Sequence, residues 1–238
     1  MNKETAIKIV NLNKTFPHKI IFNNFNLKIN KGELICILGI NGCGKTTLLK
    51  CIAGLEKYNG TIIKQSQNIG YISQDPKDMI FPWMTVKNNI IFPLPKNKID
   101  EVLLKKLLEI TRLKKYENKY PYQLSGGMVQ ILLLARALLN KSEIILMDEP
   151  FKSLDFVMAK KIQSMIIKLW CQHKPTIIIV SHDIEEAIFL ANRIIIFPKT
   201  EKRIGKIVPI NLPEKRELPL MSNTKFINIK KTVLNELF

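Results

Sequence analysis

The strongest constraint on the fold is the stretch GINGCGKTT, residues Gly39 to Thr47, which directly follows the apolar run ELICIL. Its spacing matches G-x-x-x-x-G-K-[ST], a loop whose backbone N–H groups cradle phosphates. A continuous apolar run indicates a strand buried on both faces, and KTTLLKCIAGL after the loop reads as a helix. This strand–loop–helix order makes the loop match meaningful and predicts a nucleotide site.

Each residue type in the loop has an expected task. The backbone amides should form an anion nest, backed by the positive N-terminal end of the next helix. Lys45 is expected to reach the β- and γ-phosphates, and the Thr46 hydroxyl to ligate Mg²⁺. The predicted nucleotide-binding residues of the loop are Gly39, Asn41, Gly42, Cys43, Gly44, Lys45, Thr46 and Thr47.

Short β-branched runs predict the rest of the core. IGYISQ, EIILMD, TIIIVS and RIIIF are separated by helical material, which is typical of a mostly parallel sheet with helices on both faces. Near the start, IKIVNL and FNLKI alternate apolar and polar residues, which predicts antiparallel strands with one solvated face. We therefore expect an α/β fold with a mostly parallel sheet and an N-terminal antiparallel β subdomain.

A purely helical stretch interrupts this alternation between IGYISQ and EIILMD. It predicts a helical insertion, whose segment IDEVLLKKLLEI should bury one apolar stripe. The stripe comprises Val102, Leu103, Leu107 and Ile110. The expected units are a core of residues 1–76 and 138–210, a helical subdomain of residues 77–137, and a short C-terminal tail of residues 211–238.

Polar side chains follow three of the buried runs. EIILMD delivers Asp148 to the C-terminal edge of its strand, where open α/β sheets bind ligands, and a carboxylate there suits Mg²⁺ with its water. Glu149, expected on the other face, is the predicted general base. His182, after TIIIVS, is placed to contact the γ-phosphate, although a lone histidine is more often structural. Gln74, ending IGYISQ, is expected to reach Mg²⁺ or water.

A second glycine pair opens another helix. LSGGM precedes VQILLLARALL, so Ser125, Gly126 and Gly127 at the helix start form a second expected anion site. This site lies in the helical insertion, far in sequence from the first loop. Two phosphate sites with one P-loop suggest that two copies of the chain share each nucleotide.

Charge and hydropathy limit the class of protein. The chain carries 37 Lys and Arg against 20 Asp and Glu, a formal net charge of +17, which suits nucleic acid or an anionic membrane face. The lysines are scattered and form no compact aromatic-interleaved patch, so no nucleic-acid partner is expected. No apolar run approaches the roughly 18 residues of a membrane span, and the first residues lack a signal-peptide core. A cytoplasmic location is expected.

The four cysteines show neither metal spacing nor a disulfide framework. Cys36, Cys51 and Cys171 lie in apolar or helical surroundings and are expected to be small buried hydrophobes. Cys43 stands beside Lys45 and a helix N-terminus, a setting that predicts a lowered thiol pKa and fast alkylation. The alternative is that Cys43 fills a small position and points away from the ligand.

These motifs, in this order, resemble those of the ATP-binding-cassette family, specifically the nucleotide-binding subunit of a membrane transporter. The resemblance covers about residues 5–210. GINGCGKTT resembles Walker A, Gln74 the Q-loop, LSGGM the signature, IILMDE Walker B, SLD at 153–155 the D-loop, and His182 the switch histidine. Phe16 matches the aromatic residue that stacks on adenine in the family. The alternative is a core residue, because a phenylalanine in a strand–turn context usually packs in the core.

The resemblance implies a P-loop NTPase core that binds ATP and Mg²⁺ and hydrolyses ATP. It implies a head-to-tail dimer, with each ATP between Walker A of one copy and the signature of the other. Separate permease subunits would form the channel, served by an extracytoplasmic solute-binding protein, and this subunit would lie on the inner face of the membrane. In relatives the signature helix usually continues with Gln-Arg, whereas here Ile131 follows Gln130.

The branch and the partner surface are finer predictions. FPWMTVKNNI, and SHDIEEAIFLANRIIIF followed by RIGKIVPINLP, resemble the nitrate/sulfonate/taurine importer branch. The apolar segment 76–93, with Trp83 near its centre, is expected to contact the membrane subunit, unless it is core. A soluble cassette ATPase acting on a ribosome, DNA or a metal-cluster scaffold remains the alternative. A P-loop kinase or GTPase conflicts with LSGGM and His182.

Overall fold

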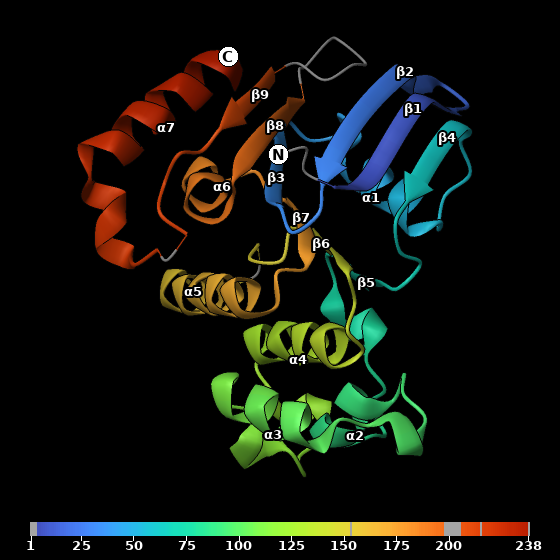
Figure 1. Cartoon of the computed structure of the whole chain (residues 1–238), viewed down its shortest axis with the longest axis vertical. Helices are drawn as coiled ribbons and strands as arrows, with labels where there is room; N and C mark the ends of the chain where they lie inside the picture. Colours follow the sequence, from blue (N-terminus) through green and yellow to red (C-terminus); the bar gives the residue numbers. More distant parts are fainter. Residues whose placement is uncertain (1–3, 153, 198–205, 215, 238) are drawn as a thin grey trace.

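The computed structural model describes residues 4–152, 154–197, 206–214 and 216–237 (Figure 1). Two sheets form the framework. A three-stranded antiparallel sheet has the order β2-β1-β4, and a six-stranded sheet has the order β5-β6-β7-β3-β8-β9. The strands are β1 (Thr5–Phe16), β2 (Lys19–Asn30), β3 (Leu34–Gly39), β4 (Asn59–Lys64), β5 (Ile69–Ile72), β6 (Ile144–Asp148), β7 (Thr176–Val180), β8 (Arg193–Phe197) and β9 (Lys206–Pro209).

The six-stranded sheet is parallel except for its last strand. β5 pairs with β6, β6 with β7, β7 with β3, and β3 with β8, all in the parallel sense, whereas β9 pairs antiparallel with β8. Together with the antiparallel β1–β2 and β1–β4 pairs, this confirms the predicted α/β class. The expected alternation also holds in β2, where Phe25, Leu27 and Ile29 are buried and the residues between them are exposed.

Helices cover both faces of the large sheet (Figure 1). The α-helices are α1 (Lys45–Ala53), α2 (Val86–Ile91), α3 (Glu101–Ile110), α4 (Gly126–Leu139), α5 (Phe156–His173), α6 (Ile184–Leu190) and α7 (Thr224–Leu237). Short 3₁₀ turns occupy Pro76–Met79, Lys96–Lys98, Lys114–Tyr116, Pro121–Gln123 and Leu218–Ser222. No helix in the described residues is long and apolar enough to cross a bilayer.

β3 separates two hydrophobic cores. Its alternate residues Leu34, Cys36 and Leu38 belong to the core shared with α4 to α7, while Ile35 and Ile37 belong to the core under α1 and the antiparallel sheet. All six residues of the strand are buried, as the continuous apolar run predicts. The strand that leads into the phosphate loop is therefore held from both sides.

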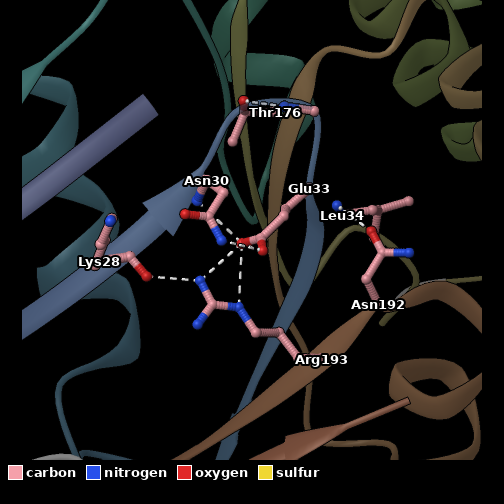
Figure 2. A network of polar contacts seen from close by, with 8 residues as sticks. Lys28, Asn30, Glu33, Leu34, Thr176, Asn192 and Arg193 are labelled. Atoms are coloured by element: carbon pink, nitrogen blue, oxygen red, sulfur yellow. Dashed lines mark hydrogen bonds and ion pairs between the residues drawn. The ribbon is translucent and has the colours of Figure 1, made fainter. Parts of the chain in front are cut away.

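A polar network fixes the amino ends of the central strands (Figure 2). Glu33, just before β3, accepts hydrogen bonds from Arg193 Nε at 3.1 Å and Arg193 Nη2 at 2.7 Å, and it also accepts from Asn30 Nδ2 at 2.6 Å. The Asn192 side-chain oxygen accepts from the Leu34 amide at 2.8 Å. These contacts tie β3 to β8 and to β2, so the loop that follows β3 starts from a fixed position.

The helical insertion is anchored by one arginine. Arg136 of α4 donates from Nη1 to the Met79 carbonyl at 2.7 Å and from Nε to the Asn89 carbonyl at 2.8 Å. Burial lowers the pKa of Arg136 to about 10. The guanidinium also lies 5.7 Å from the centre of the Phe81 ring. Segment 76–93 is thus clamped onto α4, while the Trp83 side chain remains 70% exposed.

One expectation about the helices needs correction. In α3 the buried residues are Leu104, Leu107 and Leu108, whereas Val102 is 82% exposed. The helix starts at Glu101, capped by Asp100, which turns its second residue towards solvent. The short C-terminal tail is largely helical: α7 buries Phe226 and Val233, and its Lys230 pairs with Glu185 of α6 at 2.6 Å.

Candidate active site

The predicted catalytic segments converge because four parallel strands end at one edge of the sheet. Ile37 of β3 and Asp148 of β6 both pair with Val180 of β7. The phosphate loop after β3, the Asp148–Glu149 pair and His182 therefore follow neighbouring strands at the same level. Gln74 is exposed two residues beyond β5, which pairs with β6. This is the edge at which open α/β sheets bind ligands.

The phosphate loop requires its glycines. Gly42 and Gly44 have φ angles of +76° and +107°, in the left-handed region that favours glycine. A Cβ on Gly44 would lie 2.5 Å from Ile21 Cγ2 of the β1–β2 hairpin. The same hairpin contacts the loop through Lys19, whose Nζ donates to the Gly42 carbonyl at 2.7 Å.

The hairpin also positions Phe16. This residue ends β1 and is 38% exposed, with the Lys14 ammonium 4.5 Å from its ring centre. It lies on the hairpin that contacts the phosphate loop, and its ring is open enough to stack on a base. Its role in adenine binding stays a prediction.

Lys45 and Thr46 hold their functional groups at the loop. Lys45 is 5% exposed, and its Nζ donates to the Gly39 carbonyl at 2.7 Å and the Ile40 carbonyl at 2.9 Å. The Thr46 hydroxyl hydrogen-bonds the Asp148 carboxylate. Asn41 is exposed and Thr47 is half-buried. The first turn of α1 therefore places the Lys45 ammonium and the Thr46 hydroxyl near the carboxylate of β6.

Asp148 has the surroundings of a metal-associated carboxylate. It is 2% exposed, and its Oδ1 atom is buried without a hydrogen-bond partner among the described residues. Burial raises the pKa of Asp148, while the Thr46 hydrogen bond and Lys45 act against that rise. An unsatisfied buried carboxylate oxygen beside a threonine hydroxyl fits Mg²⁺, which prefers oxygen ligands. Together, Asp148 and Thr46 could hold Mg²⁺.

Glu149 is held in an unusual backbone conformation. Its φ angle is +45°, in the left-handed region that non-glycine residues rarely adopt, and such strain is concentrated at functional sites. The side chain is 11% exposed, and Oε2 lies 3.7 Å from His182 Nδ1 and 3.1 Å from Lys152 Nζ. The lysine contact is an ion pair without hydrogen-bond alignment, so Oε2 keeps its capacity to accept a proton.

The signature residues lie elsewhere in the molecule. Ser125 caps α4, and its hydroxyl accepts from the Met128 amide at 3.4 Å. Gly127 is buried against α5, so that a Cβ there would lie 2.9 Å from Met158 Cγ. A Cβ on Gly126 would instead meet open space. α4 and α1 occupy different parts of the molecule (Figure 1). The predicted second anion site is therefore not brought to the phosphate loop of the same copy.

The structure contradicts the expected chemistry of Cys43. Burial raises the pKa of its thiol, and the nearby Lys45 only partly opposes this. The side chain packs with the core under α1, and its Sγ would lie 2.9 Å from a Cβ on Gly39. The thiol of Cys43 therefore fills a small position beside Gly39. Cys36 and Cys51 are buried as expected, while Cys171 is only half-buried.

Two residues that contact or line this site are absent from the motif-based prediction. Lys152 reaches Glu149, and Ser181, directly before His182, donates its hydroxyl proton to Glu186 Oε2 at 2.7 Å. The Glu149–Lys152 contact had a sequence signal, a lysine three residues beyond the carboxylate. Ser181 had none, because its partner is set by the start of α6.

The profile of the ABC transporter family matches residues 22–152. The chain belongs to the ABC transporter family. An aliphatic sulfonates import ATP-binding protein of Bacillus cereus is 40% identical over 225 residues, covering 91% of this chain and 88% of the relative. A second such protein, from Pseudomonas syringae, is 34% identical and covers 89% of this chain and 91% of its own length. A dimeric ATP-binding cassette, solved after hydrolysis with ADP and phosphate, superimposes with a TM-score of 0.72 at 28% identity, covering 87% of this chain and all of that one.

Family membership confirms the predicted activity. As an ABC transporter ATPase, the chain binds Mg-ATP and hydrolyses ATP. The P-loop NTPase fold predicted from the motifs is likewise confirmed. Membership of this family excludes the alternative that the chain is a P-loop kinase or a GTPase.

Proposed function

We propose that the chain drives the import of a small organic anion of the sulfonate class, with Glu149 as the general base for ATP hydrolysis. The observation that carries the catalytic part is the buried Glu149 Oε2, which lies beside His182 at the edge of the sheet and accepts no hydrogen bond from the described residues. A carboxylate in this state can orient water and accept its proton.

The remaining site residues have separate proposed roles in binding the phosphates, the metal and the nucleotide of a second copy. Lys45 and the loop amides bind the phosphates, and His182 contacts the γ-phosphate beside the base. Asp148, Thr46 and Gln74 hold the metal and its water. Mg²⁺ held by these residues would neutralise the charge that develops on the phosphates. Ser125, Gly126 and Gly127 complete the site of a second copy, which explains why they lie away from the loop of their own chain.

Two permease subunits and an extracytoplasmic binding protein complete the proposed importer, with this chain on the inner face of the membrane. The relatives named as importers of aliphatic sulfonates support the direction of transport and the class of solute. Segment 76–93, clamped to α4 with Trp83 outward, is the proposed permease contact.

Transport measurement tests this function. The chain, its permease and its binding protein are placed in proteoliposomes with MgATP inside the compartment that faces this chain, and uptake of labelled ethanesulfonate is followed. Taurine and nitrate are run in parallel, and Lys45→Ala serves as the inactive control. We expect ATP-dependent uptake of ethanesulfonate, lost in the control. ATP-dependent uptake of nitrate alone would assign a different solute, and absence of uptake of all three would overturn the proposal.

A further inference from the structure

A lysine of the β1–β2 hairpin lies against the phosphate loop and has no task in the mechanism above. Lys19 is the first residue of β2, and its Nζ donates to the Gly42 carbonyl at 2.7 Å. A Cβ on Gly42 would lie 3.4 Å from the same nitrogen. Among the described residues, the Gly42 carbonyl is the one hydrogen-bond partner of this ammonium. The charge of Lys19 is therefore directed at the loop.

The loop needs restraints from outside because of its glycines. Gly42 and Gly44 both have positive φ angles, and glycine populates many backbone conformations with similar ease. A peptide unit is planar, and its N–H and C=O groups point in opposite directions. The flip of one glycine peptide would therefore replace an amide donor by a carbonyl oxygen, which repels a phosphate. A loop that binds phosphates needs donors that hold its carbonyls.

Two ammonium groups hold carbonyls of this loop. Lys45, from α1, donates to the Ile40 carbonyl at 2.9 Å, and Lys19 donates to the Gly42 carbonyl. The Cys43 amide, at the other end of the same peptide unit, donates to the Ile40 carbonyl at 3.4 Å. Hydrogen bonds from charged donors are shorter and stronger than neutral ones. The peptide between Gly42 and Cys43 is thus held at both ends, and Lys19 makes the stronger contact.

The hairpin gives Lys19 a fixed base from which to act. Lys19 pairs with Phe16 across the turn between β1 and β2. Further along β2, Ile21 and Phe22 are buried against the loop, so that a Cβ on Gly44 would lie 2.5 Å and 3.1 Å from their side chains. Lys19 itself is exposed. Its replacement therefore removes the contact with the loop and leaves the buried packing of the strand in place.

We propose that Lys19 is a positioning residue for the phosphate site: its ammonium fixes the Gly42 carbonyl and so keeps the loop amides directed at the triphosphate before ATP arrives. Lys19 acts through the loop. Its task differs from that of Phe16 on the same hairpin, which is predicted to stack on the base. The inference rests on the phosphate-binding role proposed above for the loop, which Lys45→Ala tests separately.

Two measurements on the full chain test the inference. In Lys19→Met we expect amide hydrogen exchange of residues 39–47 to become faster in the nucleotide-free protein, while that of β6 is unchanged. The Kd values for ATP and for inorganic tripolyphosphate, each with Mg²⁺, should rise by the same factor, about threefold to tenfold for one lost hydrogen bond. Turnover at saturating ATP should persist, because the loss lies in binding.

Matched variants and the second ligand separate the loop from the base site. Lys19→Arg should keep both properties, and Lys28→Met is the control, because Lys28 is an exposed lysine of the same strand. Phe16→Ala should weaken the binding of ATP but not of tripolyphosphate, which has no base. A Lys19→Met variant that behaves in the same way would overturn the inference, because Lys19 would then act on the base.

Unchanged exchange of residues 39–47 in Lys19→Met would also overturn the inference, even if both Kd values rise, because Lys19 would then be a direct ligand of the phosphates. Unchanged Kd values would do the same. If Lys19→Met aggregates, Lys19→Ser removes the same ammonium and must produce the same changes. Full ATP affinity in Lys45→Ala would instead refute the proposed role of the loop.

Discussion

The Nδ1 atom of His182 lies 3.7 Å from Glu149 Oε2, which brings together side chains that follow the neighbouring parallel strands β6 and β7. The two groups differ in their access to solvent: the Glu149 side chain is 11% exposed and that of His182 is 55% exposed. The carboxylate is enclosed, and its Oε2 accepts no hydrogen bond from the part of the chain that the structure describes, whereas the imidazole is open to solvent.

Replacement of Glu149 by glutamine should separate binding from hydrolysis. The amide of Glu149→Gln cannot accept a proton from water, so phosphate release should fall by about 10²–10⁴-fold. MgATP binding should persist, because Glu149 is not expected to contact the phosphates. Size-exclusion chromatography with MgATP should then show an accumulated dimer. Turnover equal to that of the original protein would remove Glu149 from the role of base.

Lys45→Ala should instead weaken nucleotide binding. Hydrogen bonds to charged groups contribute about 1.5–3 kcal/mol, so the Kd for ATP should rise by roughly 10- to 100-fold. Titration calorimetry measures this directly. Lys50→Ala is the control, since Lys50 is an exposed lysine of the same helix. Equal ATP affinities in Lys45→Ala and Glu149→Gln would contradict the proposed division of labour.

Trp83→Glu should abolish co-purification with the permease and leave basal ATP hydrolysis intact. Trp83 is largely exposed, while the neighbouring Phe81 is held between Trp83, Phe92 and Arg136. A charge at position 83 therefore alters the surface without disturbing the clamp. Val102→Glu introduces the same charge at another exposed apolar position of the subdomain. A parallel loss of ATPase in Trp83→Glu would show that the substitution disturbs the helical subdomain, and it would contradict a role confined to the permease contact.

Cys43 should react slowly with N-ethylmaleimide at neutral pH. The raised pKa of its buried thiol means that the thiolate predominates only above pH 9, the ordinary pKa of the group. Below the pKa, the thiolate fraction and the labelling rate should rise about tenfold per pH unit. ATP should not protect, because the sulfur faces Gly39 rather than the ligand. Fast labelling at pH 7 that ATP blocks, measured by mass spectrometry, would restore the phosphate-facing orientation.

The parts of the fold that could be predicted are those determined by local spacing. The glycines and Lys45 of the phosphate loop, the buried run of β3 and the carboxylates after β6 each follow from a few neighbouring residues. The lowered thiol pKa predicted for Cys43 was wrong because the thiol is buried beside Gly39, and the spacing of the loop residues does not show that burial. The predicted burial of Val102 was wrong because capping by Asp100 determines where α3 starts and therefore which of its residues face solvent.

The burial of Lys160 on α5 could not be predicted either, because it also depends on contacts with residues distant in the sequence. A lysine three residues before a glutamine on an amphipathic helix is ordinarily solvated. Only the approach of α6 and Phe189 encloses it. The same holds for α7, whose attachment to α6 through Lys230 and Glu185 joins residues 45 positions apart.

The hydrogen bonds of Arg136 couple segment 76–93 rigidly to α4. The far end of α4 is Ser125, about 16 Å along the axis at 1.5 Å per residue, and Gly127 presses on α5 close to that end. Because Arg136 grips the carbonyls on either side of Trp83, that segment cannot tilt without carrying the helix with it. In the proposed importer, a displacement of the segment around Trp83 would therefore move α4 as one body, and Ser125 with it, while Gly127 stays packed against α5.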